Sequence, residues 1–461
     1  MSQTTWPLIR RALIVLGVVL ASALVSLYAL KNKIMLGAEA YVYGYPLLIM
    51  DITRAQSAVN IGLRRVRQFP DANFKDVVRP NVDTLYTTAF LSMKQGPWVF
   101  EMPLQSERYE LMPFMDAWTN VFASPGTRTS GNQGATYLLA GPEWNGQVPK
   151  GMTLLKSPTD MVWLIGRTQT NGTADFATVH ELQNRLRLTK WPQPPDSLSA
   201  STDSKRDAQA GWQVSTEPSL PPVAQMKALN TTEFFNRLMK LMVSNPPSPE
   251  DAPLLSRLAQ LEIKPGQAVH LSGSNALSFS LGRWIANQRV MKALNTKAQD
   301  GSWSYPPLNL GRYGTDYNTR AAVAMVGLGA NLPEDAVYPN TALDHQGQAL
   351  NGKHRYRLHF AANALPPVKA FWSITAYGAD EFLIDNPLQR FAIGDRDPLV
   401  FNADGSLDLW VQATPPSQKE AAANWLPVQM SAPFLLNARL YWPEDKALNG
   451  QWKMPVVERL N

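Results

Sequence analysis

The sequence predicts a mainly β fold with helices (α+β): two antiparallel β-sandwich or jelly-roll-like modules separated by a helical block, behind one N-terminal transmembrane helix. Three observations carry this expectation. Short apolar or alternating runs bounded by turns recur along the chain, a middle region has helical periodicity, and one long apolar run stands near the N-terminus. Of the 461 residues, 36 are proline and 28 are glycine, and so many fixed turns argue against a helical bundle.

The first element is the apolar run 12–30, which contains no charged residue. As a helix it would be about 30 Å long, which matches the hydrocarbon thickness of a bilayer. Arg10 and Arg11 precede it, and the positive-inside rule places that end in the cytoplasm. We therefore expect residues 1–33 to be a single-pass inner-membrane anchor with the body in the periplasm. The alternative is a signal peptide cleaved near Ala23, which would leave a periplasmic or secreted body.

The body divides into four parts by composition and periodicity. Residues 34–190 are expected to form a β-rich N-terminal domain behind a leading helix, which Pro46 kinks or breaks. Residues 191–222 carry six prolines and little periodicity, which is typical of a linker. Residues 223–300 indicate a helical block, in which an asparagine stands three residues before a glutamate, the spacing of a capping box. The β pattern returns over residues 301–461, the expected jelly-roll-like C-terminal domain.

The composition excludes several classes of protein. Cysteine is absent, so disulfide scaffolds, zinc fingers, iron–sulfur clusters and thiol nucleophiles are ruled out. The net charge is +6, but four of these charges precede residue 34 and the body has no basic run, so nucleic acid is not an expected partner. The five histidines are well separated, and the Asp-rich turns lack the spacing of a calcium loop. We expect no cofactor and no metal.

Polar side chains are concentrated in two segments of the N-terminal domain, 79–86 and 116–128. Both combine acidic, amide and guanidinium groups with aromatic rings. Sites for sugars or other small polar ligands use this combination, because the rings bury apolar surface while the polar groups bind hydroxyls or carboxylates. The expected ligand-binding residues are Arg79, Asn81, Asp83, Tyr86, Asp116, Trp118, Asn120 and Arg128. An alternative stays open, in which Asn81 and Asp83 cap a turn and the tryptophan is a buried strand residue.

Ordered motifs extend this pattern over nearly the whole chain after about residue 38. They are Arg79–Tyr86, Asp116–Phe122, Gly126–Gly131, Gly166–Thr168, Phe235–Leu238, Asn245–Pro247, Trp372–Tyr377, Asp385–Pro387, Gly394–Arg396, Asn402–Ser406, Asn424–Pro427 and Arg439–Pro443. Together they resemble a two-domain bacterial envelope family, that of the paired domains of unknown function twelve-fifty-four (N-terminal) and twelve-fourteen (C-terminal). Val82 departs from the family pattern, which has a second asparagine there. The resemblance implies export and the two β-rich domains, and it implies no reaction.

The expected function is an exported, inner-membrane-anchored envelope protein that binds a small polar or glycan-like ligand between its β modules. One alternative is an envelope hydrolase or lyase, with Asp83 or Asp116 as general acid/base and Arg128 stabilising negative charge. Another is a structural envelope protein that forms homo-oligomers through exposed Trp and Tyr surfaces. A raised carboxyl pKa in a water-excluded pocket would favour the enzyme, and a site with unperturbed acids would favour binding. The binding protein and the enzyme both require Asp83, Asp116 and Arg128 to converge in one pocket.

Overall fold

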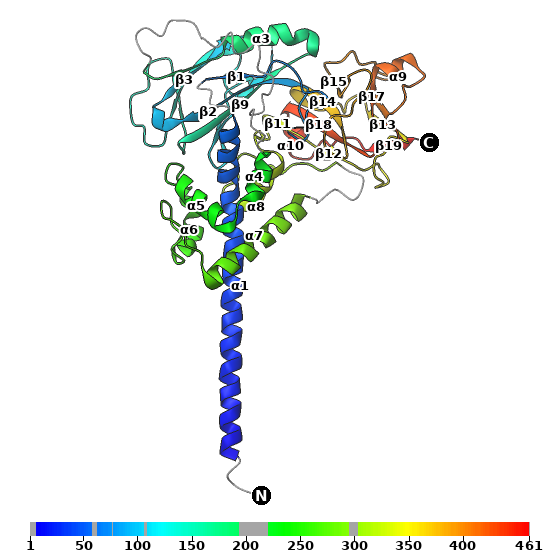
Figure 1. The fold of residues 1–461 in the computed structure, drawn as a ribbon. Helices are drawn as coiled ribbons and strands as arrows, with labels where there is room; N and C mark the ends of the chain where they lie inside the picture. Colours follow the sequence, from blue (N-terminus) through cyan, green and yellow to red (C-terminus); the bar gives the residue numbers. More distant parts are fainter. Residues whose placement is uncertain are drawn as a thin grey trace.

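The computed structural model describes residues 6–57, 62–75, 77–105, 108–192, 220–294 and 303–460 of the chain. A long N-terminal helix leads into a body in which two β modules lie beside each other, next to a group of shorter helices (Figure 1). The strands within the described ranges form four sheets. The α+β fold class predicted from the sequence is therefore confirmed, together with its long apolar N-terminal helix.

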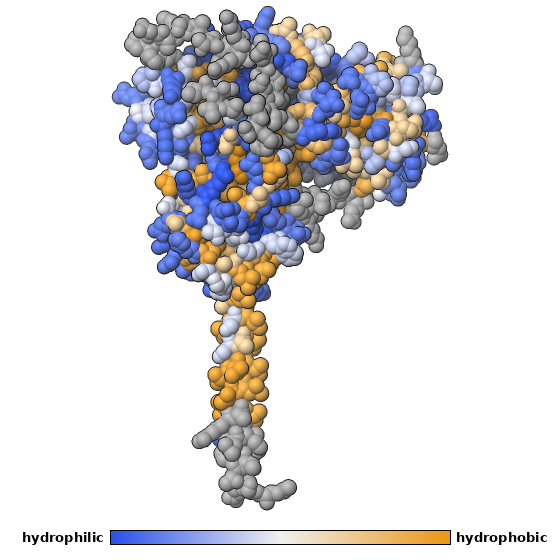
Figure 2. Space-filling view, in the orientation of Figure 1, coloured by the Kyte–Doolittle hydropathy of each residue, from blue (hydrophilic) through white to orange (hydrophobic). Residues whose placement is uncertain are grey.

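Helix α1 runs from Trp6 to Gln56 and joins two segments that the sequence predicts as separate elements. The large apolar residues over 13–28 are 54–68% exposed and form the apolar shaft in Figure 2. Residues 38–52 of the same helix lie almost wholly inside the body. Of the two outcomes expected at Pro46, a kink or a break, the break does not occur, because helices packed around this stretch hold α1 continuous through the proline. By length and composition, α1 is apolar enough to cross a membrane.

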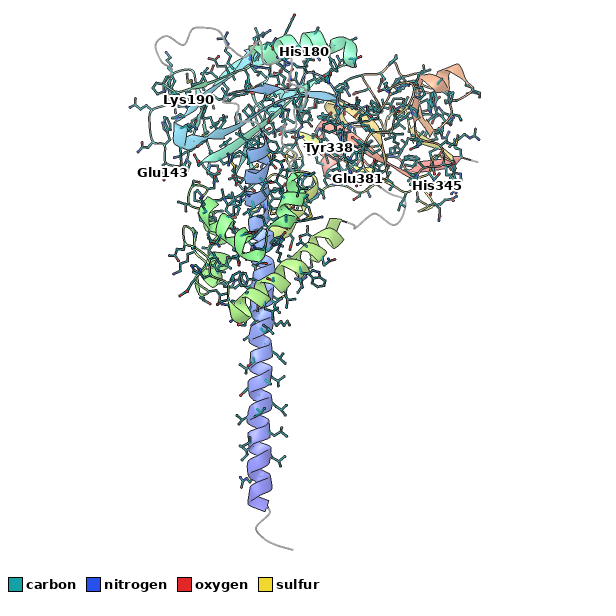
Figure 3. All side chains as sticks on the ribbon, viewed as in Figure 1. Glu143, His180, Lys190, Tyr338, His345 and Glu381 are labelled. Carbon is teal, nitrogen blue, oxygen red and sulfur yellow. The ribbon has the colours of Figure 1, made fainter. Side chains whose placement is uncertain are left out.

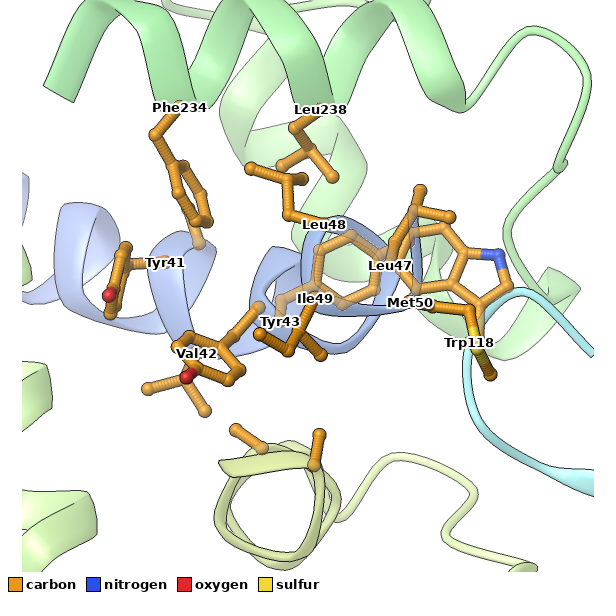
Figure 4. Close-up of a cluster of buried hydrophobic side chains, with 14 of the residues drawn as sticks. Tyr41, Val42, Tyr43, Leu47, Leu48, Ile49, Met50, Trp118, Phe234 and Leu238 are labelled. Atoms are coloured by element: carbon orange, nitrogen blue, oxygen red, sulfur yellow. The ribbon is translucent and has the colours of Figure 1, made fainter. Parts of the chain in front are cut away.

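A group of helices surrounds the buried half of α1. These are α4 (Pro222–Ala228), α5 (Thr231–Leu241), α6 (Ala252–Ala259), α7 (Gly273–Leu294) and α8 (Tyr317–Val326). The predicted capping box opens α5: Asn230 Oδ1 accepts from the backbone N–H of Glu233 at 3.0 Å, and the glutamate accepts from Asn230 N–H at 2.8 Å. In the core, the rings of Tyr41 and Phe234 lie 4.6 Å apart (Figure 4). This packing fixes α1 within the body.

Two glycines allow α1 and α7 to approach closely. A Cβ on Gly282 would lie 2.5 Å from the carbonyl oxygen of Ile34, and one on Gly37 would lie 2.9 Å from the Cα of Phe279. Real Cβ atoms do not approach that closely, so a side chain at either position would push the helices apart. The backbones therefore pack directly where α1 enters the body.

The N-terminal β module is a sandwich of two sheets. One sheet has the order β1 (Arg64–Arg65), β2 (Thr84–Ser92), β9 (Met161–Gln169), β5 (Phe114–Asp116) and β6 (Val121–Ala123), with β4 (Glu110–Leu111) also on β9. The other has the order β10 (Arg187–Lys190), β3 (Trp98–Leu104), β7 (Gln133–Ala140) and β8 (Thr153–Lys156). All pairs are antiparallel except β7 with β8. Side chains such as Ala89 and Leu91 fill the space between the sheets, which leaves the opposite face of β2 and β9 toward the helical block.

The C-terminal β module also has two sheets. One has the order β11 (Ala336–Val337), β18 (Phe434–Pro443), β14 (Val368–Gly378) and β15 (Ala392–Gly394), with β12 (Asn340–Thr341) also on β18. The other has the order β17 (Trp425–Pro427), β16 (Leu407–Gln412), β13 (Arg355–Phe360) and β19 (Val457–Leu460). Strand β13 alternates in burial as its sequence alternates in polarity. Short helices α2 (Thr127–Ser130), α3 (Phe176–Arg185), α9 (Lys419–Ala423) and α10 (Asp445–Leu448) lie in connections between strands.

Candidate functional site

A cavity of about 1290 Å³ lies where the N-terminal sheet, the helical block and the C-terminal module meet. Strands β2 and β9 form one wall, and the last turns of α1 and the end of α8 form another. Strand β18 and the loop residues Tyr338 and Glu381 close it from the C-terminal module, on the side that faces the N-terminal sandwich (Figure 3). The cavity is therefore built from all three parts of the body.

Strand alternation explains the wall formed by β2 and β9. Residues that point away from the sandwich core line the cavity, and they pair across the two strands: Phe90 opposite Trp163, Thr88 opposite Ile165 and Tyr86 opposite Arg167. The Phe90 and Trp163 rings are stacked, with centroids 5.1 Å apart and an angle of 4° between the planes. Apolar side chains of α8 and the helical block extend this surface, among them Val323, Met325, Leu328 and Leu241. Most of the lining is therefore apolar.

The polar end of the cavity contains Arg167, which is only 6% exposed. Its Nη1 donates to the carbonyl of Ile165 at 3.1 Å, and its Nη2 donates to the carbonyl of Gly329 at 2.9 Å. The guanidinium also lies 5.0 Å from the ring centroid of Tyr86. Its Nε is buried and has no hydrogen-bond partner, and within the described residues it forms no ion pair with a carboxylate. The cation is thus held by neutral groups alone.

A second buried guanidinium, that of Arg439 on β18, lies at the same end. It donates to Thr375 Oγ1 at 2.7 Å, to the Tyr377 hydroxyl at 2.5 Å and to the carbonyl of Arg79 at 3.1 Å, all neutral acceptors. Two further lining groups, the Oγ1 of Thr84 and the Oδ1 of Asn437, are buried without a partner. This end of the cavity therefore carries positive charge, and unpartnered polar atoms are buried behind its surface.

The acidic residues that line the cavity already have hydrogen-bond or ion-pair partners within the protein. Asp51 accepts from Arg54 at 2.7 Å and from Arg237 at 2.6 Å. Asp160 accepts from the Ser92 hydroxyl at 2.9 Å. Glu381 forms an ion pair with Arg79 at 2.8 Å. The electrostatic asymmetry of the cavity thus rests on its buried arginines, and among the residues with described positions no group of three or more His, Asp or Glu could hold a metal ion.

Each of the two β modules matches a protein-family model. Residues 62–190 match a model described as "Protein of unknown function (DUF1254)", and residues 335–445 match "Protein of unknown function (DUF1214)". The chain belongs to the family of paired DUF1254 and DUF1214 domains. The resemblance seen in the sequence motifs is confirmed, in the same order along the chain.

Solved structures include a protein with the same fold. The VPA0106 protein from Vibrio parahaemolyticus is 21% identical with a TM-score of 0.68, over 93% of this chain and 100% of that chain. A putative uncharacterized protein from Burkholderia cenocepacia is 12% identical with a TM-score of 0.45, over 94% of each chain. The likeness to the Vibrio protein shows a shared fold only. A comparison with curated proteins finds no match.

The structure places Asp83 between the DUF1254 and DUF1214 domains rather than on the cavity wall. It is 1% exposed, and its carboxylate accepts from Ser373 Oγ at 2.7 Å and pairs with Arg396, both of which belong to the DUF1214 domain. Arg396 also donates to the carbonyl of Thr170 at 2.6 Å. These bonds join the two domains, so Asp83 is positioned as an interdomain link.

Arg79, Asn81 and Tyr86 do line the cavity. Asn81 also caps a turn, as the alternative interpretation has it: its Oδ1 accepts from the backbone N–H of Asp83 at 2.6 Å and of Thr84 at 3.2 Å. Its Nδ2 donates to the hydroxyl of Tyr441 at 2.8 Å. This turn therefore braces the boundary between the domains beside the cavity.

The second predicted segment lies elsewhere. Asp116 is buried in its own turn, where its Oδ1 accepts from the backbone N–H groups of Trp118 at 2.8 Å and Asn120 at 2.9 Å. Burial raises the pKa of Asp116 to about 6. The Trp118 ring packs 4.8 Å from that of Tyr43 on α1. None of these residues lines the cavity, so the segment serves the core in this structure.

Arg128 forms an ion pair with Asp335 of the DUF1214 domain at 2.5 Å. It too lies outside the cavity, and it shares no partner with Asp83 or Asp116. The expected convergence of these three residues in one pocket is therefore not found.

Sequence reasoning missed the cavity residues on β9, above all Trp163 and Arg167. One signal was present: β9 reads as an almost continuous apolar run, and an arginine inside such a run needs a special environment. The cross-strand pairing with β2 that brings Tyr86 beside it could not be read from the sequence.

Proposed function

We propose that this protein is a membrane-anchored binding protein, exported to the envelope, that holds a small amphipathic anion in the cavity between its three parts. The ligand class is an apolar body, flat or chain-like, that carries a carboxylate or a similar acidic group. One observation carries the proposal: the buried guanidinium of Arg167 has no acidic partner at the end of a large, mainly apolar cavity.

The energetics of burial support an anionic ligand. A charged group removed from water is costly unless a counter-charge or a full set of hydrogen bonds compensates it. Carbonyl oxygens satisfy part of Arg167, and its Nε stays unpaired. A carboxylate at this end of the cavity would supply the counter-charge that the neighbours of Arg167 lack.

The remainder of the lining supports the apolar part of the ligand. The stacked Phe90 and Trp163 rings offer a broad aromatic surface that favours apolar or ring-shaped groups. Cavities that hold drug-sized ligands usually measure about 300–1,000 Å³, so 1290 Å³ is ample for such a molecule. This lining fits an amphipathic molecule better than the glycan-like ligand expected from the sequence.

The acids whose pKa is raised lie away from the cavity, which favours binding over general acid/base catalysis. Burial raises the pKa of Asp116 to about 6, that of Glu110 to about 7 and that of Asp395 to about 6. None of the three is among the residues that line the cavity, and the acids that do line it are held by cations or hydroxyls.

A matched ligand pair tests the proposal. We would titrate the full chain in lipid nanodiscs with 4-phenylbutanoate and with 4-phenylbutanol, using calorimetry and empty nanodiscs as the blank. The wild type should prefer the carboxylate by about 10- to 100-fold, because a hydrogen bond to a charged group contributes about 1.5–3 kcal/mol. Arg167→Gln should abolish this preference, whereas Phe90→Ala should lower the affinity for both ligands by a similar factor.

Arg187→Gln, which removes an exposed arginine of β10, is the matched control and should behave as the wild type. A preference that survives in a folded Arg167→Gln variant would refute the anion site. Binding of neither ligand by the wild type would count against this ligand class.

A further inference from the structure

Helix α7 exposes an apolar stripe to the outside of the body. Leu277, Leu281 and Trp284 are 58%, 41% and 62% exposed, although each is large and apolar. Their spacing of four and three residues places them on one face of the helix. The opposite face carries Phe279 and Gly282, which pack against α1. One face of α7 is thus part of the core, and the other has no partner within the described residues.

Helix α7 lies at the end of the body from which the shaft of α1 emerges (Figure 1). Lys33 Nζ donates to Asn275 Oδ1 at 2.9 Å, which places the start of α7 three residues beyond Leu30 on α1. Gly282 faces α1 between Ile34 and residue 38. At about 1.5 Å per residue, the stripe therefore begins about 5 Å and ends about 12 Å beyond the apolar run.

The headgroup region of a bilayer adds about 5–8 Å to each side of the hydrocarbon core, so the first part of the stripe falls within it and the last part reaches about 4 Å beyond. We propose that the Leu277–Trp284 face of α7 lies in the membrane interface, where the lipid headgroups and upper acyl chains cover it. This proposal requires that α1 spans the membrane, and it does not depend on the ligand proposed above.

The chemistry of the surroundings suits a lipid surface. Tryptophan is enriched at the membrane–water interface, because its ring is apolar and its N–H finds polar partners there. Amphipathic helices bind in the interface through an apolar face of this kind. Lys31 is exposed directly after the apolar run, and Arg289, which contacts Met35, is exposed about one helical turn further along, so both would meet lipid phosphates. The apolar run of α1 ends within one helical turn of the start of α7, which favours lipid over a second copy of the chain as the occupant.

The absence of cysteine from the chain allows a direct test. We would place single cysteines by Leu277→Cys and by Leu104→Cys, label each with a nitrobenzoxadiazole fluorophore, and reconstitute the full chain into phosphatidylcholine/phosphatidylglycerol liposomes. The two leucines are matched in exposure, at 58% and 60%, but Leu104 lies on β3 at the far end of the body. Lipids with a nitroxide on the headgroup then report contact by quenching.

We expect the probe at position 277 to be quenched several-fold more strongly than the probe at position 104, at equal thermal stability of the two proteins. A third probe, Gln288→Cys, lies further along the exposed face of α7 and should give intermediate quenching. Equal quenching at positions 277 and 104 would overturn the proposal. The fluorescence of the probe at position 277 could instead be unaffected by the nitroxide lipid and change with the number of protein molecules per liposome. That result would assign the face to contact with a second copy and would also overturn the proposal.

Discussion

The bond between Asp83 and Arg396 gives the sharpest test of how the two domains are joined. Both side chains are largely buried, at 1% and 17% exposure. Asp83→Asn would leave the guanidinium without its counter-charge in a site that excludes water. Breaking a buried pair from one side costs about 3–5 kcal/mol, so we expect a loss of this size in the free energy of unfolding of the full chain.

The assay is urea unfolding in detergent, followed by the fluorescence of the chain's 14 tryptophans, with limited proteolysis between the domains as a second readout. Arg396→Gln and the double variant complete a mutant cycle, in which a direct bond should give a coupling of about 1–3 kcal/mol. Lys75 and Asp380 form a control pair that also joins the two domains, but their side chains are 51% and 60% exposed, so Asp380→Asn should change little. Additive effects of Asp83→Asn and Arg396→Gln would refute the reasoning.

Three further predictions follow from single positions. Burial raises the pKa of Glu110 to about 7, so the folded protein binds more protons than the unfolded chain between about pH 4.5 and 7, and this contribution to stability is lost as the pH rises. Glu110→Gln should therefore stabilise the protein above pH 7, by at most about 3 kcal/mol, with the gain fading toward pH 4.5 in thermal unfolding. Gly282→Leu should separate α7 from α1 and abolish the slow amide exchange of α7, whereas Gly17→Leu, with nothing within 4 Å, should not. Asn230→Ala should cost about 1 kcal/mol in urea unfolding, because α5 loses its cap, and an unchanged midpoint would contradict this.

Features set by local chemistry could be predicted from the sequence. The uncharged run 12–30, the capping box before α5 and the alternation of β13 each depend on neighbours within a few residues, and the structure has all three. Pro46 is the counter-example, because its local preference for a break is overridden by helices that come from more than 170 residues away.

The candidate site could be predicted only in part, for a physical reason. Arg79, Asn81 and Tyr86 belong to one short segment that stands out by its polarity, and they do line the cavity. The other walls come from α1, β9, α8 and β18, which are adjacent only in the folded chain. Polarity alone also could not separate Asp83, which joins two domains, from a residue that faces a cavity.

The unbroken course of α1 has a consequence for how a ligand reaches the protein. The same rigid rod carries the bilayer-length segment at one end and Asp51, on the cavity wall, at the other. About 21 residues separate Leu30 from Asp51, so with α1 across a membrane, as proposed, this wall of the cavity lies about 30 Å beyond the edge of the hydrocarbon core. In that arrangement the proposed ligand would reach the cavity through the aqueous phase or from another protein, and not by moving sideways out of the bilayer.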